Sequence, residues 1–145
     1  MKPLYALVFL SIFLFFACSK KEEKTTFTDE FGLTWQSNLK DAFEKSKREN
    51  RIIMVMTVSK GCGWCKKMKK ETLSNPKIKK RLQKYIWVQA DRETPSEKAQ
   101  VPEFKHVPII FFMQPNREVI ENLRGFFKPE DFLYYIRELQ KDLED

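Results

Sequence analysis

Apolar residues gather along the chain in short runs that predict buried strands. Predominantly apolar runs at 51–58, 85–90 and 108–113 have the length and the β-branched and aromatic content of buried strands. A fourth strand is predicted at 119–123, directly after the turn at Pro115-Asn116. Between the second and third runs lies a polar crossing that contains Pro95 and Pro102.

Helical periodicity marks the segments between and after these strands. A first helix is predicted from Leu39, capped by Ser37 or Asn38, and a second over 62–73. Asn75-Pro76 begins a third helix that runs to about residue 84, and 129–143 is amphipathic. The last helix turns its apolar residues to the sheet: Phe132, Leu133, Ile136, Leu139 and Leu143. Strands alternating with helices, then a strand pair and a helix, predict an α/β sandwich.

The N-terminal residues have the pattern of an export signal. Residues 1–17 contain Lys2 and an apolar run at 4–16, shorter than the roughly 20 residues of a membrane span. Residues 15–18 resemble the lipobox of bacterial lipoproteins, which implies that Cys18 carries lipid and becomes the new N-terminus; Phe15 stands where that family prefers leucine. An ordinary cleaved signal or a retained short anchor is the alternative.

Export places the protein in the periplasm or cell envelope, tied to a membrane through Cys18. Ser19 follows where lipoproteins kept at the inner membrane carry aspartate, which favours the outer membrane. Residues 18–30 are charged and polar and predict a tether, and 31–145 predict one domain. The net charge of +7 would fit anionic headgroups or acidic partners. We expect no nucleic-acid partner, because an exported chain rarely meets one.

The two remaining cysteines form the pattern Cys62-Gly63-Trp64-Cys65 between a predicted strand and a predicted helix. At a helix N-terminus, free N–H groups and the helix dipole favour an anion, so the pKa of the Cys62 thiol is expected to be lowered. Cys65 lies one turn further, within reach for a disulfide. Such a pair can cycle between dithiol and disulfide through a mixed disulfide with a substrate.

Two other interpretations of the cysteine pair fit the sequence less well. A tetrahedral zinc site needs four ligands, and the chain adds only His106 and Cys18 to the pair. We therefore expect no metal. A purely structural cross-link over so short a loop would remove little chain entropy.

The whole pattern resembles the thioredoxin superfamily over nearly all of 31–143. The resemblance depends on the strand before the cysteine pair, on Val107-Pro108 at the start of a strand, on the Pro115-Asn116 turn and on Gly125 before the last helix. It implies a thioredoxin fold, a central mixed sheet flanked by helices. It also implies that Cys62 is the nucleophile and Cys65 the resolving thiol, and that no cofactor beyond this disulfide is needed.

The resemblance also implies a substrate-binding surface around the cysteines. Pro108 would have a cis peptide bond, and the backbone of Val107 would pair with the substrate chain. Trp64 would form part of the docking surface, with a partly buried core position as the alternative. Lys60, Gly61, Gly63 and His106 are candidates for tuning the site, although an exposed loop position for His106 is equally expected. Four phenylalanines are predicted to pack in the core: Phe111, Phe112, Phe126 and Phe127.

The chain departs from thioredoxin at two positions. Thioredoxin has a buried aspartate six residues before its nucleophile, where this chain has Met56, and Gly-Pro between its cysteines, where this chain has Gly63-Trp64. Without a nearby carboxylate the thiolate is more stable, so we expect a reduction potential above the roughly −270 mV of thioredoxin.

These observations predict an exported thiol:disulfide oxidoreductase that reduces disulfides of envelope proteins and is reset by a membrane electron donor. A dithiol oxidase or disulfide isomerase would use the same chemistry in the other direction. A different class is a redox-linked chaperone or Cu(I)-binding module, because thiolates bind Cu(I) and Met54, Met56 and Met68 lie nearby in sequence. We expect these methionines to pack in the core instead.

Overall fold

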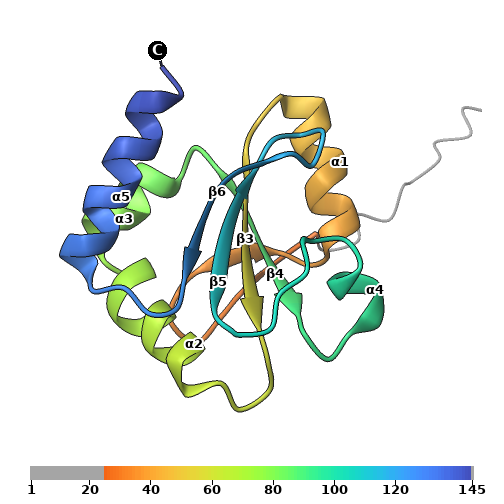
Figure 1. The fold of residues 1–145 in the computed structure, drawn as a ribbon, viewed down its shortest axis with the longest axis horizontal. Helices are drawn as coiled ribbons and strands as arrows, with labels where there is room; N and C mark the ends of the chain where they lie inside the picture. The colour runs from red at the N-terminus through yellow and green to blue at the C-terminus, as the bar shows by residue number, and fades with distance from the viewer. Residues whose placement is uncertain (1–24, 145) are drawn as a thin grey trace, which may run out of the picture.

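A six-stranded mixed sheet forms the centre of the computed structural model of the protein, which describes residues 25–144 (Figure 1). Its spatial order is β1-β2-β4-β3-β5-β6. Strands β2, β4 and β3 run parallel, and the pairs β1–β2, β3–β5 and β5–β6 are antiparallel. The strands are β1 (Thr26–Thr28), β2 (Thr34–Gln36), β3 (Ile53–Val58), β4 (Ile86–Asp91), β5 (Ile109–Met113) and β6 (Val119–Arg124).

Helices cover both faces of the sheet. One face carries α1 (Leu39–Glu49) and the short α4 (Pro95–Lys98). The other face carries α2 (Gly63–Lys67), the π-helical turn η1 (Met68–Leu73), α3 (Pro76–Leu82) and α5 (Pro129–Asp142), on the opposite side of the sheet in Figure 1. This layered arrangement is a thioredoxin fold, so the predicted fold class is confirmed.

Alternation along the strands divides the core into two apolar layers. In β3, Met54 and Met56 face α2, η1 and α5, whereas Ile53 and Val55 face α1. The predicted apolar face of the last helix packs in the first layer, where Phe132, Ile136 and Leu139 are buried. Phe111 and Phe112 are also buried, one in each layer. The continuous apolar runs therefore arise because β3 and β5 are covered on both faces.

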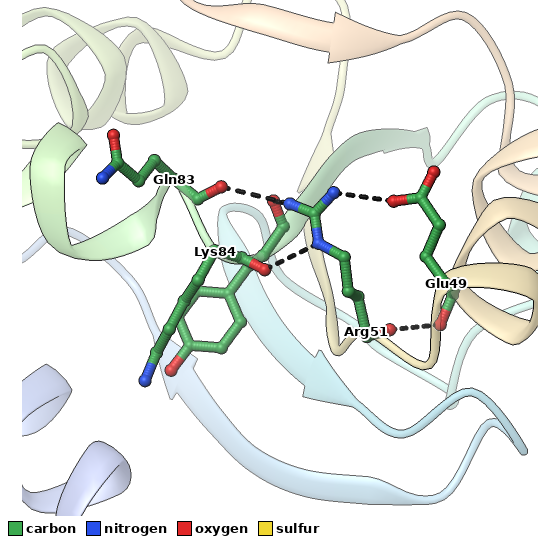
Figure 2. A network of polar contacts seen from close by, with 6 residues as sticks. Glu49, Arg51, Gln83 and Lys84 are labelled. Carbon is green, nitrogen blue, oxygen red and sulfur yellow. Dashed lines mark hydrogen bonds and ion pairs between the residues drawn. The ribbon is translucent and has the colours of Figure 1, made fainter.

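Polar contacts fix where β3 begins (Figure 2). The Arg51 guanidinium donates to the carbonyl oxygens of Lys84 (2.9 Å), Gln83 (3.1 Å) and Tyr85 (3.2 Å), and to the Glu49 carboxylate (2.8 Å). Figure 2 shows the guanidinium lying between Glu49 and the carbonyls of Gln83 and Lys84. One side chain thus joins the end of α1 to the turn that leads into β4.

Side-chain caps begin two of the predicted helices. The Asn38 side chain accepts a hydrogen bond from the Asp41 amide (2.8 Å) at the start of α1. The Asn75 side chain accepts one from the Lys77 amide (3.0 Å), and Pro76 occupies the first position of α3.

The structure differs from the sequence-based expectation at the N-terminal edge and in the crossing. Thr26–Thr28 belongs to the predicted tether at 18–30, but it pairs with Thr34–Gln36 as β1 and β2. The folded domain therefore begins near residue 26, because backbone pairing rather than side-chain burial holds this polar strand. The predicted polar crossing contains one short helix, α4.

The predicted export signal at 1–17 and Cys18 lie outside the described residues. Within residues 25–144, no helix combines the length and apolar character needed to cross a membrane.

Candidate active site

Cys62 and Cys65 form a disulfide at the point where β3 passes into α2. Their Cα atoms are 5.3 Å apart. After β3 the chain turns through Gly61, whose φ of +73° is a left-handed conformation that glycine adopts without strain. The Cys62 amide donates to the Ser59 carbonyl (3.2 Å) within this turn. The turn presents the disulfide at the N-terminus of α2.

The two sulfurs have different surroundings. Cys62 is the N-cap of α2, and its Sγ accepts a hydrogen bond from the Cys65 amide (3.1 Å). Cys62 is half-buried, whereas Cys65 is only 4% exposed and belongs to the core layer. A substrate sulfur can therefore reach Cys62, while Cys65 is shielded behind it. In the reduced protein, the N-terminal end of the helix favours a thiolate at Cys62.

Val107 and Pro108 lie just before the start of β5, at the same end of the strands as the disulfide. Because β3 and β5 are antiparallel, the start of β5 lies beside the end of β3. The Thr57 hydroxyl bonds the Ile109 amide (2.8 Å) and carbonyl (3.2 Å), which fixes this juxtaposition. The Val107-Pro108 peptide bond is cis; Pro108 is buried and Val107 half-buried.

Trp64 lies on the surface next to the disulfide and is 58% exposed, which argues against the core alternative. Its ring is 5.8 Å from that of Phe126, centroid to centroid. The Lys67 ammonium lies 5.3 Å from the Trp64 ring and 4.7 Å from the Phe126 ring. Phe126 and Phe127 are half-buried and pack against the core layer, so the predicted core packing is confirmed in part. They follow Gly125, where the chain leaves the sheet before α5.

A cavity of about 270 Å³ opens on the other side of the disulfide. Lys69, from η1, reaches into it, and its Nζ donates to Gln89 Oε1 (3.1 Å) and lies 3.7 Å from Asp29 Oδ2. Burial lowers the pKa of the Lys69 ammonium, and the Asp29 carboxylate opposes this shift. No local sequence pattern indicates this pair, because its members lie forty positions apart.

Of the predicted tuning residues, Lys60, Gly61 and Gly63 adjoin the disulfide, whereas His106 lies apart from the cavity. Lys60 and Gly61 are exposed at the rim of the cavity, where the Lys60 amide donates to the Glu93 carboxylate (3.3 Å). Gly63 begins α2 and has open space around it. His106 is exposed in the loop two residues before Pro108 and does not line the cavity.

The three methionines of the copper interpretation are buried. Met54 and Met56 are 0% exposed and Met68 is 1% exposed, all within one core layer. Across residues 25–144, no three His, Cys, Asp or Glu side chains are placed to hold a metal ion. The methionine sulfurs thus serve packing in this structure.

Comparison with known proteins places this arrangement in a family. A family model described as thioredoxin-like matches residues 34–115, more than half of the chain. Mouse anterior gradient protein 3 is 26% identical over 83% of this chain and 75% of its own length. Human anterior gradient protein 2 homolog is 26% identical over 70% of this chain, which spans only 58% of that relative.

Solved structures show the same fold. A thioredoxin from Thermus thermophilus superimposes with a TM-score of 0.59 at 22% identity, covering 70% of this chain and 83% of that one. The oxidised C-terminal domain of DsbD from Neisseria meningitidis gives 0.56 at 20% identity, covering 68% and 90%. With Cys62 and Cys65 joined at the N-terminus of α2, the chain belongs to the thioredoxin-like family and is a thiol:disulfide oxidoreductase.

Proposed function

We propose that this protein is exported and reduces disulfides of cell-envelope proteins. The observation that carries the proposal is the unequal exposure of the two sulfurs, Cys62 half-buried and Cys65 4% exposed. A pair arranged in this way lets a partner meet one sulfur and keeps the other for the intramolecular step. The electrons are carried by this disulfide, without a further cofactor.

The reductive cycle begins with the dithiol form. The Cys62 thiolate attacks a substrate disulfide, forms a mixed disulfide and releases one substrate thiolate, which takes up a proton. The Cys65 thiol then loses its proton and attacks the Cys62 sulfur, which forms the Cys62–Cys65 disulfide and releases the second substrate thiol. The substrate gains two electrons, and the protein loses two. A membrane dithiol donor must return these electrons through disulfide exchange with the Cys62–Cys65 pair.

Two surfaces beside Cys62 support docking of an extended substrate chain. The backbone of Val107 lies just before β5, at the end of the strands that carries the disulfide, where it can form main-chain hydrogen bonds with a substrate. Trp64 and Phe126 form an aromatic surface on the α2 side. Exposed aromatic groups of this kind bury large apolar areas on binding.

The proposed location of the protein in the cell is based on the sequence of the N-terminal segment. We propose that Cys18 is lipidated and that the lipid holds the protein at the outer membrane, facing the periplasm. Fatty-acid labelling of the full-length protein tests this: Cys18→Ala should lose the label, and a labelled Cys18→Ala protein would contradict it.

Trapping of partners tests the function itself. With Cys65→Ser, the mixed disulfide at Cys62 cannot be resolved, so disulfide-linked partners should accumulate in cells and disappear on reduction. Cys62→Ser is the matched control and should trap none and lose turnover. Absence of partners with Cys65→Ser would contradict the reductase proposal.

The buried Met56 favours an alternative to the reductase function, in which the protein acts as a dithiol oxidase or disulfide isomerase. Met56 is fully buried in the layer that contains Cys65, so no carboxylate at this position destabilises thiolates. A stabilised dithiol form raises the reduction potential. Equilibration with glutathione and dithiothreitol buffers measures the reduction potential of the Cys62–Cys65 pair and distinguishes the two functions. A potential well above about −270 mV favours an oxidase or isomerase, and one near or below this value favours a reductase that receives electrons from a donor.

A further inference from the structure

Lys69 is the one lysine of the described residues that enters the cavity beside the disulfide with its ammonium largely withdrawn from solvent. Its side chain is 15% exposed, and that of its partner Asp29 is 10% exposed. By contrast, Lys66 lies at the cavity rim with a 72% exposed side chain and pairs with Glu30 at 3.9 Å. The cavity lining includes Cys62, Cys65, Lys69 and Gln89.

Contacts from three other segments hold the Lys69 ammonium in place. Gln89 on β4 accepts its hydrogen bond, and the Trp35 ring on β2 lies 5.6 Å away. Asp29, in the turn between β1 and β2, lies 3.7 Å away. This carboxylate is itself fixed, because it accepts hydrogen bonds from the amides of Phe31 and Leu33 and from the Trp35 indole.

Lys69 follows Cys65 by about one helical turn. The two residues are four apart in the continuous α2–η1 segment, so they lie on the same helical face. Gln89 pairs in register with Met56 on the neighbouring strand, so the two side chains point to the same face of the sheet. The surroundings of Cys65 are thus apolar at Met56 and charged at Lys69.

A buried thiol in apolar surroundings has a raised pKa, yet only the thiolate can attack a mixed disulfide. A cation in the same cavity removes this obstacle by favouring the charged form of the sulfur. We propose that the Lys69 ammonium, held by Asp29 and Gln89, activates Cys65 as the resolving thiol by stabilising its thiolate. The proposal rests on the dithiol–disulfide function proposed above.

The chemical step balances without a further reactant. The Cys65 thiol gives its proton to solvent in the cavity, which is large enough to hold water. The thiolate then forms the bond to Cys62 Sγ, and the bond from Cys62 Sγ to the substrate sulfur breaks. The leaving thiolate takes up a proton. Lys69 keeps its own proton throughout and is a positioning residue.

Other charged groups around the cavity also affect the stability of the Cys65 thiolate: carboxylates lower it and ammonium groups raise it. Glu30 adjoins Asp29, Lys66 comes from α2, and Lys60 comes from the loop before it. Asp91 at the end of β4 also lines the cavity. Hydrogen bonding with the Glu93 side chain and from the Glu93 amide (2.9 Å to Asp91 Oδ1) lowers the pKa of the Asp91 carboxyl, which favours its charged form.

The test separates the reactions of the two cysteines in one experiment. The fully reduced, full-length protein carries Cys18→Ala in every sample, so that only Cys62 and Cys65 react, and is mixed with the chromogenic disulfide DTNB: the first coloured thiolate reports attack by Cys62, and the second reports resolution by Cys65. Both rates are measured from about pH 5 to 9. The variants are Lys69→Met, Lys69→Arg and, as a control with the same change in charge, Lys70→Met on the exposed side of η1.

With Lys69→Met, the second phase should slow about tenfold near pH 7, corresponding to a rise of about one unit in the pKa of Cys65. The first phase should change less than about twofold, and the two proteins should converge above the Cys65 pKa. Lys69→Arg should restore the second phase, and Lys70→Met should match the unmodified protein. If Lys69→Met leaves Asp29 unpaired and prevents folding, Asp29→Asn with Lys69→Met keeps the pair neutral and should show the same slow phase.

Overlapping second-phase profiles for Lys69→Met and the unmodified protein would overturn the proposal, and so would equal slowing of both phases. In either case, normal release of the second thiolate by the unmodified protein would leave the proposed function intact. Failure of the unmodified protein to release the second thiolate would instead remove the proposed function.

Discussion

The hydroxyl of Thr57 is predicted to be a principal link between β3 and the loop that carries Pro108. The backbone register of β3 with β5 ends at the pair Met56 and Ile110. Beyond it, the Thr57 hydroxyl accepts from the Ile109 amide (2.8 Å) and donates to the Ile109 carbonyl (3.2 Å). Thr57 is 0% exposed and Ile109 is 4% exposed, so water cannot replace these bonds in the folded protein.

Thr57→Val isolates the contribution of these bonds. Valine has nearly the shape of threonine, so the change creates no cavity and adds no strain. It withdraws the partner from a buried amide, which costs about 1–3 kcal/mol, and loss of the hydroxyl's own burial offsets part of this. We expect a loss of about 2 kcal/mol in the free energy of unfolding, a large share of the 5–15 kcal/mol typical of a domain.

Urea unfolding of the oxidised protein, followed by tryptophan fluorescence, measures this loss. With an m value of about 1–3 kcal/mol/M, the midpoint should fall by about 1 M while m stays constant. Thr57→Ser keeps the hydroxyl and is the control, with a loss of at most about 1 kcal/mol from the missing methyl group. A Thr57→Val protein within about 0.5 kcal/mol of the unmodified protein would refute the reasoning.

Three further predictions concern the fold and the surface of the site. Arg51→Met should lower the free energy of unfolding by about 2 kcal/mol, because three carbonyls lose a charged donor; calorimetry checks this against Arg48→Met, an exposed change of equal charge that should have little effect. Tyr85 Oη has no hydrogen-bond partner among the described residues, and burial raises the pKa of its phenol above the usual 10.0. Its contribution to stability is therefore present below about pH 10 and lost as pH rises further, so Tyr85→Phe should be neutral near pH 7 and lose less stability above pH 10 in urea titrations; equal alkaline losses would contradict this. Trp64→Ala should lower kcat/KM for a protein disulfide about tenfold while DTNB reduction changes less than about twofold, and equal losses would show that Trp64 acts on the chemistry instead of docking.

The elements that can be predicted from the sequence are those buried over many residues, because burial requires a long run of apolar side chains. Strands β3, β4 and β5 are covered by helices or neighbouring strands, so their apolar runs were unmistakable. β1 and β2 have three residues each, and Thr26–Thr28 lies at the sheet edge with its side chains largely in solvent. Nothing in so short a polar segment distinguishes a strand from a tether until its partner is known.

The same distinction applies to the site. Cys62 and Cys65 could be found because their chemistry depends on local spacing. The Lys69–Asp29 pair depends on packing between the first turn of the domain and η1, which no local pattern records. Its aromatic side chain predicts a core position for Phe126, but after Gly125 the chain leaves Phe126 only half-buried, with its ring beside that of Trp64.

The early start of the folded domain limits how far it can stand from a membrane. If Cys18 carries the lipid, as we propose, the chain from Cys18 to Thr26 can extend by at most about 25–30 Å. A free segment reaching residue 30 would have allowed about 40 Å. The start of the domain would then stay within about 30 Å of the headgroups, so partners fixed in that membrane would meet the domain at high local concentration.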